Sequence, residues 1–328
     1  FDKPPWQFII IPKTYEGNEA VVLFRAHHGL ADGVSLTRFL LEQFPDEPLT
    51  NNQLVKFSSV DRKWMLLNAL LSGAKIIIEK LISRPDNSII HGPLPGGVKK
   101  MSWSKPISLQ TVKKIKNCTS TTVNDVLMAC VSMSFHDYFK THGVSSPPDV
   151  TASVPVDTRP RGKPLKLENN FAIVSLKLPA SKDNPLKNLH ETKIHMDNIK
   201  HSGEAFAISV GGSMSVEYMP ECITNLWNVP IANKHSCVLS NVPGPQQPFS
   251  ISGHKVKQMF FAPPQRDLVG IGIGLVSYAG EFTIGVSCDL NCMTDPQHIV
   301  KAFESRLEQL EKCVASTNGQ TEFDSGIE

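Results

Sequence analysis

The sequence carries little net charge and no basic cluster. Its 33 Lys and Arg residues nearly balance its 31 Asp and Glu residues, which leaves a formal charge of +2 at pH 7. No basic run is interleaved with aromatic residues, so the sequence gives no reason to expect a nucleic-acid partner. With 328 residues, 41% of them hydrophobic, the chain is long enough to bury a large core and to divide into two lobes.

Cysteine is also scarce, and its spacing suggests neither a disulfide framework nor a metal site. The seven cysteines are an odd number and lack the spacing of zinc-binding motifs. They therefore favour a reducing compartment over a disulfide-stabilised secreted fold. They lie at positions 118, 130, 222, 237, 288, 292 and 313.

The long apolar segment 64–82 is interrupted by polar side chains. On a helical projection, Asn68, Ser72, Lys75 and Glu79 fall in one narrow stripe of an otherwise apolar helix. Polar residues spaced along the whole segment argue against a membrane span. Two alternatives remain open: a helix packed in the core or between lobes, and a helix lying on a membrane or lipid-droplet surface with its stripe toward water.

The most informative motif is the run His27-His28-Gly29-Leu30-Ala31-Asp32-Gly33. It follows an apolar segment, 20–26, that is typical of a buried strand, and it precedes an amphipathic helix expected at 34–44. Imidazole titrates near neutral pH, so a histidine there can accept a proton from an alcohol or amine and return it to a leaving thiolate. We expect Gly33 to supply unusual backbone angles in the turn. The pattern suits acyl transfer.

This run resembles the HHxxxDG signature of acyltransferases that share the chloramphenicol acetyltransferase fold. Six further blocks, between residues 2 and 280, resemble the wax ester synthase/diacylglycerol acyltransferase family in sequence and in order. Pro5 stands where the family usually has leucine, and Asn169 stands where it has glycine. The family also has a segment before the first block, so we expect a fragment or a shortened member. The blocks are Asp2–Trp6, Thr122–Ala129, Val154–Arg159, Asn169–Phe171, Ser240–Pro245 and Ser277–Gly280.

The resemblance implies an α/β fold, a two-lobed chloramphenicol acetyltransferase-like sandwich. Mixed sheets would be covered by helices, with the active site in the channel between the lobes. We expect residues 1–92 to complete the N-terminal lobe, 93–316 to form the C-terminal lobe, and 317–328 to be a disordered polar tail. Strands are expected at 7–12, 20–26, 101–105, 150–156, 171–178, 237–239, 257–261, 269–278 and 282–288, and helices at 34–44, 109–116, 123–138, 186–200 and 296–313.

The resemblance also implies roles within the histidine run. His28 would be the general base and His27 structural, and adjacent strand residues do point to opposite faces. Asp32 would turn away from the active centre, pair with Arg159 and so clamp the lobes. The alternative is that Asp32 is a surface acid and Arg159 a solvated charge. The divergence of the two histidines also argues against a metal site at His27, His28 and Asp32, so no metal is expected.

Two further pairs of residues can supply hydrogen-bond donors. Asn124 and Asp125 begin a predicted helix, where a side-chain amide and the helix dipole can stabilise an oxyanion. A purely structural helix cap explains this pair equally well. Ser240 and Asn241 precede a proline-rich turn. Two interpretations stay open: the pair binds substrate, or it only sets the geometry of the loop.

The activity implied by the resemblance is O-acyl transfer. A long-chain acyl group would move from acyl-CoA, a substrate, to a fatty alcohol or diacylglycerol, and no cofactor is expected. The fatty alcohol is the expected acceptor because no basic cluster is present for a charged one. We expect a peripheral protein at the cytosolic face of the endoplasmic reticulum or on lipid droplets. Two rivals stay open: a condensation-type N-acyltransferase, and a truncated, inactive lipid-binding or scaffold member.

Overall fold

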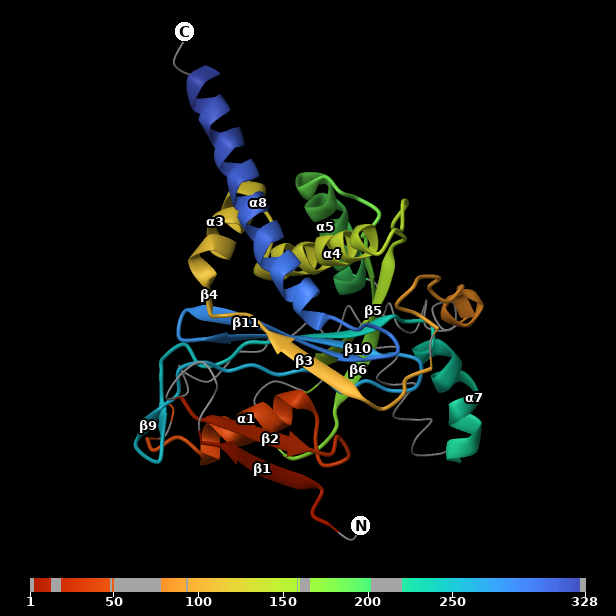
Figure 1. Cartoon of the computed structure of the whole chain (residues 1–328), viewed down its shortest axis with the longest axis vertical. Helices are drawn as coiled ribbons and strands as arrows, with labels where there is room; N and C mark the ends of the chain where they lie inside the picture. The colour runs from red at the N-terminus through yellow and green to blue at the C-terminus, as the bar shows by residue number, and fades with distance from the viewer. Residues whose placement is uncertain are drawn as a thin grey trace.

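A computed structural model describes most of the chain, as layers of helices and strands (Figure 1). A central sheet separates a layer of helices from a smaller N-terminal layer (Figure 1). The described residues are 3–12, 19–47, 49, 78–92, 94–157, 159, 166–201 and 220–324.

The central sheet has seven strands in the order β3-β11-β10-β7-β5-β6, with β4 also pairing with β11. It is mixed, because β7 runs parallel to both β10 and β5 whereas the other neighbours are antiparallel. A separate hairpin, β8–β9, follows β7. The strands are β3 (Lys99–Trp103), β4 (Ile107–Ser108), β5 (Val150–Asp157), β6 (Phe171–Leu178), β7 (Cys237–Val242), β8 (Ser250–Ile251), β9 (His254–Lys255), β10 (Ile271–Tyr278) and β11 (Glu281–Asp289).

Four helices cover one face of this sheet and appear above it in Figure 1. Phe135, Phe139 and Phe303 are completely buried between these helices and the strands. Alternate residues of β6, such as Leu176 and Leu178, point into this core, as expected for a strand with one face toward the helices. The helices are α3 (Leu109–Thr119), α4 (Val123–Thr141), α5 (Pro185–His201) and α8 (Pro296–Asp324).

Helix α8 continues further than the sequence predicts. The sequence predicts a disordered tail from residue 317, but the helix runs to Asp324. Asn318 and Gly319, a pair that often ends helices, do not end this one. Once a helix has been nucleated by core packing, each added residue contributes a backbone hydrogen bond, so it can extend through polar sequence. Disorder of the tail 317–328 stays a prediction.

The N-terminal layer, on the other side of the sheet, consists of β1 (Trp6–Ile11), β2 (Val21–Ala26) and α1 (Gly33–Gln43) (Figure 1). β1 and β2 pair in antiparallel register. A small aromatic cluster joins the three elements, since the ring of Phe8 lies 4.7 Å from that of Phe24 and 5.2 Å from that of Phe44. The turn that connects β2 to α1 carries the histidine run.

After the β8–β9 hairpin, the chain crosses the sheet instead of joining it. The predicted strand at 257–261 is wrong. Gly272 and Gly274 of β10 let this segment approach closely, because a Cβ on either would lie within 2.5 Å and 2.3 Å of the carbonyl oxygens of Pro263 and Phe261, respectively. The apolar run thus packs across the strands, on the face that lacks the helices.

The other predicted helices and strands lie within a few residues of their expected bounds, and one helix was not expected. Helix α7 (Glu221–Ala232) contains Pro230, which as a helix breaker argues against a helix there. Of the predicted helix 64–82, residues 64–77 lie outside the described residues, and residues 78–82 are helical. Within the described part of the chain, no helix combines the length and apolar character needed to cross a membrane.

Candidate active site at the histidine turn

Backbone hydrogen bonds and the ring of His27 shape the histidine turn. The amide of His27 donates to the Pro5 carbonyl (2.7 Å), and the amide of Leu30 donates to the His27 carbonyl (3.0 Å). Nδ1 of His27 accepts a hydrogen bond from the amide of Gly29 at 3.1 Å. His27 is exposed, and its ring is engaged with the turn itself. The structural role of His27 stays a prediction.

His28 is half-buried and is contacted from the segment that leads into β6. The ring of Phe171 lies 5.6 Å from the His28 ring in an edge-on arrangement, with an interplanar angle of 65°. Nδ2 of Asn169 donates to the His28 carbonyl at 2.9 Å. His27 and His28 therefore have different surroundings, and His28 is the one held against the central sheet.

Asp32 is buried and both of its carboxylate oxygens accept hydrogen bonds. It is 4% exposed and acts as the N-cap of α1, where Oδ1 accepts from the amide of Ser35 at 2.9 Å. Oδ2 accepts from the Arg159 guanidinium and, at 2.8 Å, from the amide of Asn170. Burial alone would raise the pKa of Asp32, but the hydrogen bonds from Asn170, Arg159 and Ser35 outweigh it and lower the pKa below its ordinary value.

Arg159 is the centre of this network. Its side chain is 12% exposed, and Nη1 donates to Asp157 at 2.9 Å. Nη2 donates to the Ser35 hydroxyl (2.8 Å) and the Glu168 carbonyl (3.0 Å), as well as to Asp32. The pair that the resemblance implies, Asp32 with Arg159, is thus present, and it joins the histidine turn to the end of β5.

Gly33 does not have the role expected from the sequence. It is the first residue of α1, and its φ lies outside the left-handed region. A Cβ at this position would meet nothing within 4 Å. The prediction of unusual backbone angles is therefore wrong. The turn is closed by the Leu30 amide, which donates to the His27 carbonyl, and by the Ser35 amide, which donates to the Asp32 carboxylate, rather than by a strained glycine.

The structure separates the roles of Asn124 and Asp125. Asp125 is fully buried in a capping box, in which Thr122 and Asp125 each accept the other's backbone amide hydrogen. Asn124 is exposed, and its Oδ1 accepts a hydrogen bond from Nδ2 of Asn241 at 2.6 Å. Asn124 and Asn241 therefore form one polar pair, whereas Asp125 has the structural role of a cap.

Ser240 and Asn241 lie on opposite faces of β7. Cys237 and Leu239 are buried in the core beneath the helices, so Asn241 follows their face and meets α4. Ser240 lies on the other face, the one that carries the N-terminal layer. The described contacts of the Asn124–Asn241 pair do not include the histidine turn.

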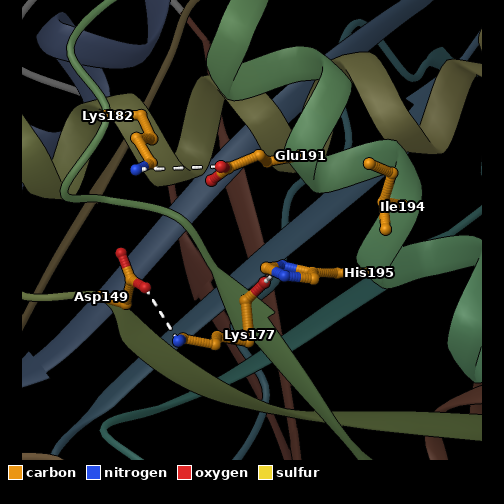
Figure 2. Close-up of a pocket in the computed structure, with 6 residues that line it drawn as sticks. All are labelled: Asp149, Lys177, Lys182, Glu191, Ile194 and His195. Atoms are coloured by element: carbon orange, nitrogen blue, oxygen red, sulfur yellow. Dashed lines mark hydrogen bonds and ion pairs between the residues drawn. The ribbon is translucent and has the colours of Figure 1, made fainter.

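A hollow elsewhere on the surface has a volume of about 370 Å³ and lies between β6, the start of β5 and α5 (Figure 2). Lys177 pairs with Asp149 at 3.0 Å, and Lys182 pairs with Glu191 at 3.8 Å. Figure 2 shows the His195 ring turned toward Lys177, whose carbonyl oxygen lies 2.7 Å from Nδ1. Because its opposite charges are paired with each other and it contains no predicted site residue, this hollow is not part of the candidate site.

Sequence reasoning missed that five residues of the segment 166–171, all except the exposed Leu167, contact the histidine turn or the start of α1. The Ser35 hydroxyl bonds to the carbonyls of Lys166 and Glu168 at 3.1 and 3.2 Å, and the Asp32 amide donates to the Glu168 carbonyl at 3.3 Å. The only signal in the sequence was the block at Asn169–Phe171, which marks the family but does not reveal what the residues contact. We call residues 166–171 the strap.

Comparisons with known proteins agree with this fold. Residues 167–311 match the model of the WS/DGAT C-terminal domain. The chain is 23% identical to a probable diacylglycerol O-acyltransferase of Mycobacterium tuberculosis, covering 94% of this chain and 72% of that protein. It is also 23% identical to O-acyltransferase WSD of Acinetobacter baylyi (95% and 74% covered) and 26% identical to wax ester synthase/diacylglycerol acyltransferase 8 of Arabidopsis thaliana (94% and 74%).

Solved structures give the same result. The wax ester synthase/diacylglycerol acyltransferase from Marinobacter aquaeolei superposes with a TM-score of 0.64 at 18% identity, covering 95% of this chain and 72% of the other. The first condensation domain of the CDA synthetase superposes with a TM-score of 0.51 at 15% identity, covering 94% and 66%. These likenesses confirm the predicted fold class.

Removing either partner of the Asp32–Arg159 pair is expected to destabilise the protein strongly. Asp32→Ala and Arg159→Ala should each lower the free energy of unfolding by about 3–5 kcal/mol, because each leaves a buried charge unpaired. The double variant should lose much less than the sum. Urea unfolding of the four proteins measures the coupling. The surface pair Lys114–Glu311, with side chains 56% and 34% exposed, serves as control and should give a coupling below about 1 kcal/mol.

The Asp32–Arg159 pair should also make the free energy of unfolding depend on pH. Since the folded-state pKa of Asp32 is below the ordinary value of 3.8, its contribution is complete above that value and is lost as the pH falls through the folded-state pKa. Arg159→Ala should therefore show a shallower loss of stability below about pH 4 than the wild type. Additive single-variant effects with an unchanged acid profile would contradict the pairing.

Proposed function

We propose that this chain, a relative of the wax ester synthase/diacylglycerol acyltransferases, is an acyl-CoA-dependent O-acyltransferase whose general base is His28. The observation that carries the proposal is the buried pair of Asp32 and Arg159, which holds the turn bearing His28 against the central sheet. Because hydrogen bonds occupy both oxygens of Asp32, this acid supports the turn rather than acting as the third member of a triad.

The reaction requires one proton to move twice. His28 accepts the hydroxyl proton of the acceptor while the hydroxyl oxygen attacks the thioester carbonyl carbon. The tetrahedral intermediate then collapses, the carbon–sulfur bond breaks, and the CoA thiolate takes the proton from His28. No covalent acyl-enzyme is needed in this scheme.

Polar side chains on both faces of β7 are proposed to contact substrate. The carbonyl of the Asn124 amide accepts from Asn241, which leaves the NH₂ group of Asn124 as the part that can donate to substrate. The hydroxyl of Ser240 lies on the sheet face that carries the histidine layer. We assign substrate-facing roles to these two groups and to Asn241, and a structural role to Asp125.

We propose a long-chain fatty alcohol as the preferred acceptor, with diacylglycerol used less readily. An alcohol on an apolar chain needs a base and an apolar tunnel, whereas a polar acceptor also needs placed hydrogen-bond partners. Names among the related proteins include both diacylglycerol O-acyltransferases and wax ester synthases. A condensation-type N-acyltransferase and an inactive lipid-binding scaffold are the rivals.

We also propose peripheral association with the endoplasmic reticulum membrane or lipid droplets. Ile78 and Ile82, which lie one helical turn apart, are 55% and 73% exposed, and Leu81 beside them is 44% exposed. Arg84, two residues further along the chain, is exposed, whereas Nζ of the half-buried Lys80 donates to the Ser175 hydroxyl at 2.6 Å. An exposed apolar surface next to an exposed arginine suits an interface rich in anionic lipid.

A competition assay tests the proposed activity. The protein is incubated with a long-chain acyl-CoA and equimolar hexadecanol, diacylglycerol and a small amine, and the products are identified by mass. We expect wax ester as the main product and triacylglycerol as a minor one. Amide alone would favour the condensation-type rival, and the absence of any product from folded protein would favour the scaffold.

Replacing His28 is expected to remove activity without unfolding the protein. His28→Ala should lower kcat by at least about 10²–10⁴-fold, the usual contribution of a general base. His27→Ala should lose less activity and more thermal stability, because the His27 ring supports the turn. CoA release and thermal melting of both purified variants measure the difference. Turnover by His28→Ala comparable with wild type would refute the assignment.

Adding charge to the exposed turn at 78–82 tests the membrane proposal. The variant Ile78→Glu/Ile82→Glu should lose co-sedimentation with vesicles that contain anionic lipid while its melting temperature stays near that of wild type. Leu186→Glu, which also places charge at an exposed leucine but on α5, is the matched control and should still bind. Unchanged binding by the double variant, or its unfolding, would contradict an interfacial role for this turn.

A further inference from the structure

Successive residues of the strap contact Asp32 and His28 of the histidine turn in alternation. Glu168 and Asn170 bond through their backbones to Asp32, whereas Asn169 and Phe171 contact His28. We propose that Asn169 and Phe171 are positioning residues that fix His28 for proton transfer. This inference rests on the proposed function, in which His28 is the base.

The two contacts hold His28 at two independent places. The hydrogen bond from Asn169 Nδ2 to the His28 carbonyl, at 2.9 Å, fixes the peptide plane that follows His28. The edge-on contact with the Phe171 ring, at 5.6 Å, restricts rotation of the imidazole itself. One contact therefore limits the backbone and the other limits the side chain. Together they define where the ring nitrogen points.

The buried ion pair supplies the fixed reference for both contacts. Phe171 begins β6 and pairs with Asp157 of β5, and Asp157 in turn accepts from Arg159. Arg159 donates to Asp32 at the other end of the histidine turn. Strap and turn are thus tied to the same corner of the sheet, so the distance between Phe171 and His28 is set by ordered strands rather than by a free loop.

Asn169 is well placed to act on His28 without being essential to folding. It is exposed, so its loss creates no cavity, and its side chain bonds to the turn rather than within the strap. The corresponding position in the block that this chain resembles is usually glycine, which has no side-chain donor. Asn169 therefore gives this chain a hydrogen bond to the base-bearing residue that a glycine at this position would not provide.

Kinetics of four variants test the positioning role. Asn169→Gly should lower kcat about tenfold with little change in KM, the loss expected for one hydrogen bond that orients a catalytic group. Asn169→Gln, which retains the donor, should recover part of this loss. Phe171→Leu keeps an apolar side chain but removes the ring, and should lower kcat by more than tenfold. Leu167→Ala, an exposed strap residue, is the matched control and should leave kcat unchanged.

A second readout does not depend on activity. NMR of ring-labelled histidine, with the His28 signal among the 11 histidines identified by its loss in His28→Gln, reports the ring's surroundings directly. Phe171→Leu should shift the His28 signal by removing the ring current of Phe171. Asn169→Gly should broaden or split the signal, because the ring samples more than one orientation. Leu167→Ala should do neither.

The outcomes separate this inference from the proposed function. One outcome is that wild-type protein lacks transferase activity while the His28 signal still changes as expected in both Asn169→Gly and Phe171→Leu. In that case the proposed reaction is refuted and the positioning of His28 stands. If His28 signals are unmoved in Asn169→Gly and Phe171→Leu, the positioning role is refuted whatever the activity. If Asn169→Gly, Phe171→Leu and Leu167→Ala all lose kcat and melting temperature to the same extent, the strap has only a structural role and the positioning role is refuted.

Discussion

The buried ion pair between Arg159 and Asp32 is the interaction on which the arrangement of the site depends. Its partners are 127 residues apart in the chain, and each comes from a different layer of the fold. Two charges removed from water need hydrogen bonds as well as each other, and here a backbone amide, a hydroxyl and a carbonyl supply most of them. Nε of Arg159 is buried without a hydrogen-bond partner among the described residues and lies 4.0 Å from the Glu168 carboxylate. A single network therefore decides where the histidine turn lies relative to the sheet.

That network also assigns different tasks to residues that are neighbours in sequence. Asp32 caps α1 and binds Arg159, so both of its carboxylate oxygens have structural partners, while His28 at the same turn is half-buried and is the base in the proposed reaction. The same division occurs at α4, where buried Asp125 forms the cap and the exposed side chain of Asn124 bonds to Asn241 instead. In both places a structural acid fixes the backbone beside a residue whose side chain can act.

Much of this could be predicted from the sequence, where the physical signal is local. The strand before His27, the start of α4 and the strand at 171–178 depend on neighbouring residues, and all three were expected. The expectation that the strand before His27 is buried is wrong, because Val22 and Leu23 of β2 are 60% and 40% exposed and β2 lies in a two-stranded sheet. The segment 257–261 has the same apolar character as a strand, but whether it pairs in the sheet or crosses it depends on the glycines of β10. The contact between Asn169 and His28 joins residues 141 positions apart, and no local pattern encodes it.

The central claim is that the turn and the strap form one cooperative unit held by the Asp32–Arg159 pair. Native-state hydrogen exchange measures this directly, because the amides of Ser35 and Asn170 both donate to Asp32 from opposite sides of the interface. The account predicts that these two amides exchange with the same opening free energy, and that Arg159→Met lowers both by the same amount. Slow exchange at Asn170 combined with fast, independent exchange at Ser35 would contradict it.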